Sequence, residues 1–454
     1  MQQVGTNHYR VPGDVPIDVF ANEPILRTFG DAVFQQASNT AAIPGVESVV
    51  LMPDAHSGYG APIGAVVATK NTLIPMVAGY DISCGMSFLQ TSLQVEQLAD
   101  WRIRRGVIQA IEGRVALGRD KAVTPVTKDR FERILREGAQ GYPADIRDRL
   151  ERVNFDSQAQ LSARARQRGI ETVGSVGSGN HFIEVQAVAL QQPQLAQPFG
   201  VRNGVGVMIH TGSRGLGHQV ASEFLHELQA QGRQRPADRE LVFMPADSDV
   251  GRRYLDAMGA AANIAIVNRL LLLAQVAEVL EEQFGATTQV VYDISHNLIQ
   301  QEDLDGEPHW IHRKGATRAF PAGHPSLPAR WQRTGHPIIT PGSMGTSSHI
   351  QVAETGARAS LYSINHGAGR VLSRRAANRD LKQAEADRWL ADKDILVNTR
   401  HVPLDESAAA YKDIDQVIDS IAGAGLARVV AKLPSDGGDQ RGLMTASYTW
   451  LVCR

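Results

Sequence analysis

The sequence predicts an α+β fold, with β-sheets flanked by helices. Three observations support this class: apolar runs that end at polar motifs, strongly helical segments, and glycine-rich motifs that extend from residue 52 to beyond residue 366. A site built from such distant motifs must draw on most of the chain. We therefore predict one catalytic domain over residues 1–454, although this length ordinarily suggests roughly two to four domains.

Three short apolar runs have the length and flanking residues of buried strands. They cover residues 46–52, 205–210 and 288–294. Each run ends at a polar motif, which is where loops place functional side chains.

Helical spacing of apolar residues marks three further segments. They are residues 146–168, residues 216–230, and residues 260–284, which stop before Gly285. Two segments rich in Pro, Gln and Arg, 187–203 and 319–337, are predicted to be loops.

The composition is that of a soluble globular enzyme, with 43% hydrophobic and 21% charged residues. No apolar run of about 18 residues occurs, so no membrane-spanning helix and no membrane partner are expected. The N-terminus lacks the pattern of a secretory signal, so we expect a cytoplasmic protein. The two cysteines, Cys84 and Cys453, exclude a disulfide framework as the organising principle.

The net charge of −2 argues against a generic nucleic-acid coat protein, which would be basic. It still permits a local basic groove. Three basic runs are candidates for one, and each is equally consistent with a solvated helix or loop face: residues 101–106, 163–169 and 312–318.

Five residues with metal-binding side chains occur in similar contexts. Asp81 and Cys84 lie three apart in "YDISCG", and His181, His210 and His296 each stand next to a predicted strand. Singly, Cys84 is more typical of a buried inert thiol, and each histidine of a satisfied core residue. Together they favour one metal site. Their softness suits zinc, and residue chemistry alone does not select manganese over zinc.

Two loops have the character of phosphate-binding sites. "HTGSRGLG" runs from a predicted strand into a predicted helix and contains Arg214, while "TPGSMGTSSH" is rich in hydroxyls and free amides. In "GSGNHFIE", the carboxylate of Glu184 is suited to accept from the donors of a guanine. Each loop is also consistent with an ordinary turn, and neither a Walker loop nor a Rossmann fingerprint is present.

His366 stands in "SINHGAGR" beside a glycine pair and an arginine. It is either a structural imidazole in a turn or a nucleophile next to a phosphate, for which Gly367 and Gly369 would leave room. Asp54 and His56 of "MPDAH" have no role assigned by the sequence, beyond orienting neighbouring groups or opening a cyclic phosphate.

In combination these motifs resemble the RtcB-type RNA-splicing ligases. The matching segments cover about residues 50–420 in the same order: "MPDAHSGYG", "GYDISCGM", "GSGNHFIE", "HTGSRG", "RKGA", "PGSMG", "NHGAGRVLSR" and "AYKDID". The resemblance implies helices and sheets around a deep active-site cleft. It also implies a GTP- and Mn²⁺-dependent ligase that joins RNA 2′,3′-cyclic phosphate or 3′-phosphate ends to 5′-hydroxyl ends, in RNA repair or tRNA splicing.

The resemblance also implies residue roles. Two Mn²⁺ ions would share Cys84, with Asp81 and His181 completing one site and His210 and His296 the other. His366 would become guanylylated and pass GMP to the RNA 3′-phosphate, while Arg214 and Arg370 would contact RNA phosphate. The positions implied to contact GTP are Asn180, His181, Phe182, Ile183, Glu184, His296, Asn297, Pro341, Gly342, Ser343, Met344, Ser348, His366, Gly367, Ala368, Gly369 and Tyr411.

The chain departs from the family pattern at its C-terminus. Residues from about 430 to 454 lack the usual terminal Lys-Gly, and Arg454 is the candidate replacement for the lysine that touches the nucleotide. This departure motivates a second hypothesis: an enzyme that guanylylates or repairs RNA 3′-ends with weak or no sealing. A non-catalytic RNA-binding scaffold and a metallophosphatase are two further hypotheses. An activator or repair partner protein is compatible with each.

Overall fold

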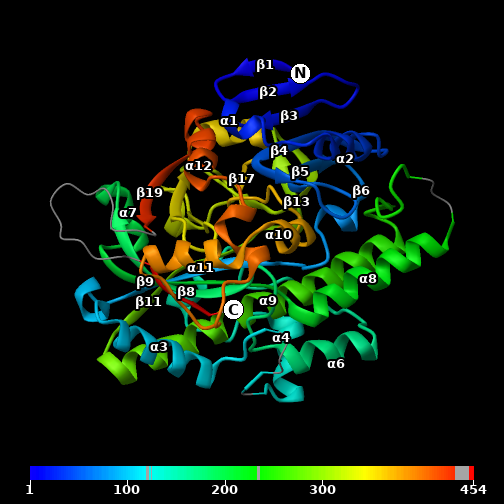
Figure 1. Ribbon diagram of the computed structural model, residues 1–454. Helices are drawn as coiled ribbons and strands as arrows, with labels where there is room; N and C mark the ends of the chain where they lie inside the picture. The colour runs from blue at the N-terminus through cyan, green and yellow to red at the C-terminus, as the bar shows by residue number, and fades with distance from the viewer. Residues whose placement is uncertain (119–121, 124, 233–235, 435–448, 454) are drawn as a thin grey trace.

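Two large β-sheets organise the chain in the computed structural model, which describes residues 1–118, 122, 123, 125–232, 236–434 and 449–453. Figure 1 shows β1 to β5 of the first sheet toward the top of the molecule and β8, β9 and β11 of the second in the lower half, with α3, α4 and α6 below them. This arrangement confirms the predicted α+β class.

The first sheet has seven strands among the described residues, and the second has a path of seven strands with two more attached. The first runs in the order β1 (Gln2–Gly5), β2 (His8–Val11), β3 (Ile17–Phe20), β4 (Val46–His56), β5 (Ile63–Thr69), β13 (Glu307–Lys314) and β12 (Asn297–Leu304). The second runs in the order β11 (Thr288–Ser295), β7 (Gly85–Thr91), β9 (Gly204–Thr211), β8 (Phe182–Leu190), β19 (Ala427–Leu433), β16 (Ser348–Ala353) and β15 (Pro337–Thr340), with β18 (Leu396–Val397) and β20 (Thr449–Cys453) attached. Two short pairs are β6 (Thr72–Leu73) with β10 (Met244–Pro245), and β14 (Ala316–Arg318) with β17 (Ser363–Asn365).

Helices cover both sheets (Figure 1). The α-helices are α1 (Glu23–Leu26), α2 (Asp31–Ala41), α3 (Trp101–Arg114), α4 (Lys128–Glu137), α5 (Ala144–Arg147), α6 (Ala163–Thr172), α7 (Pro193–Phe199), α8 (Arg214–Ala230), α9 (Asp249–Phe284), α10 (Arg374–Asp380), α11 (Gln383–Asp392) and α12 (Ile414–Gly423). Short 3₁₀ segments are η1 (Pro75–Val77), η2 (Val95–Leu98), η3 (Ala329–Trp331), η4 (Thr355–Ser360), η5 (Leu404–Glu406) and η6 (Ala408–Ala410).

The second sheet is buried on both faces. Val207 on one face belongs to a core cluster with Ile108 of α3 and Leu273 of α9. Its neighbour Met208 belongs to a second cluster on the other face, with Trp331 and Ile350. Because successive side chains of a strand point to opposite faces, such a strand must be apolar along its length. This explains the continuous apolar runs at 205–210 and 288–294.

Four strands of the second sheet bring their ends together. β11, β7, β9 and β8 are neighbours, and each pair is antiparallel. Gly85 at the start of β7 pairs with Ser295 at the end of β11 and with Thr211 at the end of β9, while Phe182 at the start of β8 pairs with His210. The residues that precede or follow these strands therefore meet at one end of the sheet.

Helix α9 runs behind this part of the sheet and is longer than predicted. It begins at Asp249 because the Ser248 side chain caps it, accepting from Gly251 N–H at 3.0 Å, and it ends at a left-handed Gly285. Contrary to expectation, α9 is long and apolar enough to span a membrane, but 89% of its most apolar 18-residue window is buried inside the protein. It packs as a core helix.

A buried ion pair links α9 to β11. The Arg269 guanidinium donates to both carboxylate oxygens of Asp293, at 2.6 and 2.8 Å, and both side chains are almost completely buried. Burial by itself lowers the pKa of Arg269, but the Asp293 charge outweighs it and raises the pKa overall.

The predicted helix over residues 146–168 is wrong in its centre. Only its two ends are helical, in α5 and α6, because other elements use the backbone between them. Glu151 N–H donates to the Asp293 carbonyl of β11, and Phe155 N–H donates to the Asn263 side chain of α9. The Ser162 hydroxyl then caps the start of α6.

The predicted loop 187–203 is also partly wrong. Strand β8 continues to Leu190, and α7 follows with Pro193 at its first turn and a left-handed Gly200 after its end. Proline is tolerated there because that N–H has no helical partner. Segment 319–337 is a loop apart from η3 and the first residue of β15, as predicted.

The basic run 312–318 is not a surface groove. Arg313 lies buried and pairs with Glu302 at 2.6 Å, and Lys314 is also buried, donating to the backbone carbonyls of Tyr59 and Ala61. A buried cation needs such partners. Burial lowers the pKa of Lys314 to about 7.

We predict that Arg269→Met destabilises the protein by about 3–5 kcal/mol, because it leaves the Asp293 carboxylate buried without its partner. Equilibrium denaturant unfolding monitored by circular dichroism measures the change. The control is Arg114→Met, which breaks partly exposed pairs with Glu278 and Glu282 and is expected to cost less than about 1 kcal/mol. Equal losses in the two variants would contradict the prediction.

Candidate active site

The five predicted metal ligands lie in one row at the strand ends described above. Asp81 Oδ2 is 2.9 Å from His181 Nε2, which is 3.3 Å from Cys84 Sγ. Cys84 Sγ is 3.2 Å from His210 Nε2, which in turn is 3.3 Å from His296 Nε2. Cys84 thus occupies the centre of the row.

The second ring nitrogens of two of these histidines fix how the rings face the row. Nδ1 of His181 is 3.1 Å from the Val176 carbonyl, and Nδ1 of His210 is 2.9 Å from the Asn180 carbonyl. Because a carbonyl only accepts, each Nδ1 acts as a donor. His210 Nε2 therefore presents a lone pair to the row, whereas His181 Nε2 donates to the Asp81 carboxylate and would exchange that proton for a metal ion. An Nδ1 that donates to a backbone carbonyl is typical of metal-binding histidines.

Burial sets the protonation of the row. It lowers the pKa of His210 and His296 well below the ordinary value, which keeps both rings neutral. Burial also raises the pKa of the Cys84 thiol well above its usual value. For Asp81, burial acts to raise the pKa, but the hydrogen bond and charge of His181 lower it overall.

Three of these donors could hold a metal ion. Cys84 Sγ and a ring nitrogen each of His181 and His210 lie within 4.8 Å of one another, and all three residues are buried. Asp81 and His296 extend this group at its two ends. Such a set of thiolate, imidazole and carboxylate donors is compatible with metal binding.

His366 lies at the His296 end of this row. The centroids of the two rings are 4.9 Å apart. Asp54, which is fully buried near the end of β4, holds His366 through one oxygen: Oδ2 accepts from His366 Nδ1 at 2.7 Å, from His366 N–H at 3.0 Å and from Gly367 N–H at 3.3 Å. Nδ1 therefore carries the proton, and Nε2 of His366 has a free lone pair.

Gly369 makes this contact possible. It has a φ of +74°, and a Cβ there would lie 2.2 Å from the Asp54 carbonyl oxygen. Gly369 thus leaves room for β4, and it also lines the cavity beside His366, so that its role in making room for a phosphate stays a prediction. At Gly367 a Cβ would come no closer than 3.4 Å to its nearest neighbour, so that position has space.

A cavity of about 210 Å³ opens beside His366. The lining residues that the resemblance implied for GTP contact are Asn180, Phe182, Pro341, Gly342, Ser343, His366, Gly367, Ala368, Gly369 and Tyr411. They come from the start of β8, the loop after β15, the loop after β17 and the segment before α12. The structure therefore gathers segments more than 200 residues apart in the sequence around one space.

Other positions implied for GTP contact lie outside this lining. The side chain of Ile183 is buried in the core on the opposite face of β8, so it cannot reach the cavity. The Asn297 side chain links two other segments of the chain: it donates to the Asp81 carbonyl at 3.1 Å and accepts from Gly315 N–H at 2.7 Å.

Ser348 supports the cavity wall, accepting from Gly342 N–H at 3.1 Å, while Glu184 is buried on β8. Arg454 lies outside the described residues.

The two arginines expected to contact RNA phosphate lie at opposite ends of the row. The Arg214 guanidinium is 3.4 Å from His181 Nδ1, and its pKa is lowered by burial. Arg370 lines the cavity but is engaged within the protein, donating to the Tyr411 hydroxyl at 2.9 Å and to the Asp405 carbonyl at 2.6 Å.

Two further residues at the site, Asp54 and Arg374, have no firm role that the sequence predicts. Asp54 could be noticed in "MPDAH", but its partner lies 312 residues away in the chain. Arg374 also lines the cavity and pairs with Asp405 at 2.7 Å. Its only sequence signal is its place at the end of "NHGAGRVLSR".

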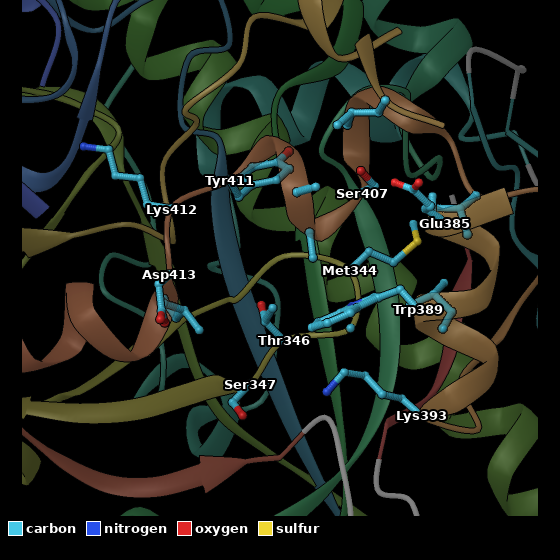
Figure 2. A pocket seen from close by; sticks show the side chains of 18 of the residues that line it. Met344, Thr346, Ser347, Glu385, Trp389, Lys393, Ser407, Tyr411, Lys412 and Asp413 are labelled. Carbon is cyan, nitrogen blue, oxygen red and sulfur yellow. The ribbon is translucent and has the colours of Figure 1, made fainter. Parts of the chain in front are cut away.

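A larger cavity of about 700 Å³ lies on the other side of the loop after β15 and shares Tyr411 with the smaller one. Figure 2 shows Trp389 and Lys393 of the α11 region facing Thr346 across this space. Met344, another position implied for GTP contact, lines this cavity. The ammonium of Lys393 lies 4.7 Å from the centre of the Trp389 ring.

Comparison with known proteins relates nearly the whole chain to one family. A family described as "tRNA-splicing ligase RtcB" matches residues 36–435. The "tRNA-splicing ligase RtcB" of Thermococcus kodakarensis is 37% identical, with 93% of each chain covered. The "RNA-splicing ligase RtcB" of Mycobacterium tuberculosis is 40% identical, covering 88% of this chain and 98% of its own.

We predict that the metal-free protein binds two Co²⁺ ions per chain and develops a thiolate-to-cobalt absorption band in the near ultraviolet. Cys84→Ser should remove this band, because serine supplies no thiolate. The control is His401→Ala, a largely exposed histidine away from the row, which should keep the band. A band that persists in Cys84→Ser would contradict the assignment of Cys84.

Proposed function

The chain belongs to the RtcB family of tRNA-splicing ligases, and we propose on that basis that it is a GTP- and Mn²⁺-dependent RNA ligase. It would join 2′,3′-cyclic phosphate or 3′-phosphate ends to 5′-hydroxyl ends. The observation that carries this proposal is the position of His366. A histidine with a free Nε2 stands at one end of a metal-ligand row and lines a cavity formed by residues implied to bind GTP.

In the first proposed step, His366 Nε2 attacks the α-phosphorus of GTP. A bond forms between nitrogen and phosphorus, and the bond to the bridging oxygen breaks, so that pyrophosphate leaves with the electron pair. Asp54 keeps the proton on Nδ1 and stabilises the positive charge that develops on the ring. The product is a phosphoramidate between His366 and GMP.

In the following steps GMP passes to the RNA. An oxygen of the RNA 3′-phosphate attacks the GMP phosphorus, and the bond to His366 breaks. The 5′-hydroxyl oxygen of the second RNA end then attacks the activated 3′-phosphate, loses its proton, and GMP leaves. An RNA that carries a 2′,3′-cyclic phosphate must first be hydrolysed to a 3′-phosphate.

The metal ions would be held by Asp81, His181 and Cys84 on one side and by Cys84, His210 and His296 on the other. When bound, they would supply positive charge to the phosphoryl oxygens. Arg214, beside His181, and Arg370, in the cavity lining, are the proposed contacts to phosphate. A single catalytic domain and a cytoplasmic location remain predictions.

We predict that incubation with labelled GTP and Mn²⁺ forms an acid-labile covalent guanylate on the protein. His366→Ala should lose it completely, because no nucleophile remains. Absence of an adduct in the native protein across a series of divalent metals would contradict the proposal.

The same preparation should join RNA carrying a 2′,3′-cyclic phosphate to RNA carrying a 5′-hydroxyl. An adduct without a joined product would instead support the hypothesis of a guanylylating enzyme without sealing.

We predict that Asp54→Asn slows formation of the His366 adduct by on the order of a hundredfold or more, because an amide neither fixes the Nδ1 proton nor stabilises the charged ring as a carboxylate does. Rapid quenching with labelled GTP measures the rate. The control is Asp415→Asn, a largely exposed carboxylate paired with Lys432, which should react at the native rate. A native rate in Asp54→Asn would show that the carboxylate only supports the fold.

A further inference from the structure

Tyr59 is an exposed aromatic residue close to the metal-ligand row. Its side chain is 68% exposed, more than any other large hydrophobic side chain in the described part of the protein. It lies in the turn between β4 and β5, in the motif "HSGYGAP". A ring so exposed contributes little to the core, so its position needs another explanation.

The turn that carries Tyr59 is held from two directions by groups that do not touch its ring. The buried Lys314 ammonium donates to the Tyr59 carbonyl and, at 2.9 Å, to the Ala61 carbonyl. On the other side the Gln36 side chain clamps Gly58, donating to its carbonyl at 2.6 Å and accepting from its N–H at 3.1 Å. Burying an ammonium costs free energy unless it is hydrogen-bonded. The hydrogen bonds from Lys314 and Gln36 therefore fix the backbone conformation of this turn.

Tyr59 begins a row of aromatic rings that leads to the metal ligands. Its ring centroid is 6.0 Å from that of Tyr80, in an edge-on arrangement, and Tyr80 stacks on His218 with centroids 5.0 Å apart. Tyr80 immediately precedes Asp81, the outermost metal ligand, whose side chain is 33% exposed. Tyr59 and His218 are exposed and Tyr80 is half-buried between them, so the three rings lie at the surface beside the accessible end of the ligand row.

The Tyr59 turn also connects to His366. Lys314 holds the turn, and its neighbour Gly315 packs so closely that a Cβ there would lie 2.4 Å from Ile63 and 2.9 Å from His366. Lys314 and Gly315 thus contact both the turn that carries Tyr59 and the proposed nucleophile His366. These two adjacent residues link the aromatic rings to the reacting centre.

Charged groups border the rings. The Arg168 guanidinium donates to the side chain of Gln219, the residue after His218, at 2.9 Å. Glu240 lies beside the turn, since a Cβ at Gly60 would come within 3.4 Å of its Cβ. One cation and one anion therefore flank the exposed residues Tyr59 and His218.

We propose that Tyr59, Tyr80 and His218 form a stacking surface for the bases of single-stranded RNA next to the broken end. This rests on the proposed function, since it assumes an RNA substrate. Stacking on aromatic rings tolerates any base, because every base has a π-face. Such a surface suits an enzyme that must accept broken ends of varied sequence, and Arg168, which donates to Gln219 beside His218, is a nearby cation for a backbone phosphate.

The test uses the full-length protein loaded with Mn²⁺, without GTP, and two short labelled single-stranded RNAs. One RNA ends in a 3′-phosphate and the other begins with a 5′-hydroxyl, so the two arms identify which strand uses the row. Tyr59→Ala should raise the dissociation constant for at least one RNA by roughly 5- to 100-fold. Tyr59→Phe keeps the ring and should bind within about twofold of the native protein.

Val4→Ala is the control. Val4 is an apolar residue that is 45% exposed on β1 and lies outside the three basic runs, so its loss should leave RNA binding unchanged. Thermal unfolding of each variant shows whether the fold is intact. The proposal is overturned if the native protein binds neither RNA, or if Tyr59→Ala binds both as tightly as the native protein. The GMP adduct of the native protein, measured without RNA, reports separately on the proposed function.

Discussion

The buried guanidinium of Arg269 is the constraint on which the site depends. Besides pairing with Asp293, it donates to the Ser83 carbonyl at 2.7 Å, to the Thr211 carbonyl at 3.2 Å and to the Ser295 hydroxyl at 3.3 Å. Each of these three residues adjoins a metal ligand in the sequence: Cys84, His210 and His296, respectively. One side chain of α9 therefore fixes three ligand-bearing segments from behind.

Connecting these segments through an ion pair costs free energy, because both charged groups must leave water. The advantage of the guanidinium is that its hydrogen bonds have fixed directions. A guanidinium has five donors in a fixed plane, so it sets the relative positions of its partners in a way that apolar packing cannot. A buried lysine has a comparable position, although it lacks the fixed plane of a guanidinium: Lys412, mostly buried, donates to the Pro53 and Ala55 carbonyls at 2.9 and 2.7 Å, on either side of Asp54. Buried basic side chains thus position both the ligand row and the partner of His366.

Much of the site could be predicted from the sequence, because its residues stand at the ends of apolar runs that are recognisable as strands. His210 and His296 are examples: β9 and β11 both run antiparallel to β7, which lies between them, so their C-terminal ends lie at the same end of the sheet. The sequence could not show which strands are neighbours, since pairing depends on contacts more than 100 residues apart, such as those of β7 with β9 and β11. For the same reason Asp54 had no partner until the fold placed it against His366.

The wrong predictions share a physical cause. The segment 148–162 has helical spacing but gives its backbone hydrogen bonds to β11 and α9, so tertiary contacts override local preference. The basic run at Arg313 and Lys314 looks like a surface patch because sequence alone does not reveal Glu302 or the Tyr59 carbonyl as partners. In both cases the deciding partner is remote in the chain or hidden by the fold.

The ligand row has two different ends, and this asymmetry bears on how two substrates would reach it. At one end His296 is buried and abuts His366, which lines the smaller cavity. At the other end Asp81 is partly exposed and follows Tyr80. On the proposed function, GTP occupies the His366 end and RNA approaches along the Asp81 end. The two reactants would then meet over the ligand row, where the metal ions held by it would supply positive charge to the phosphates of both, and neither has to leave before the other enters.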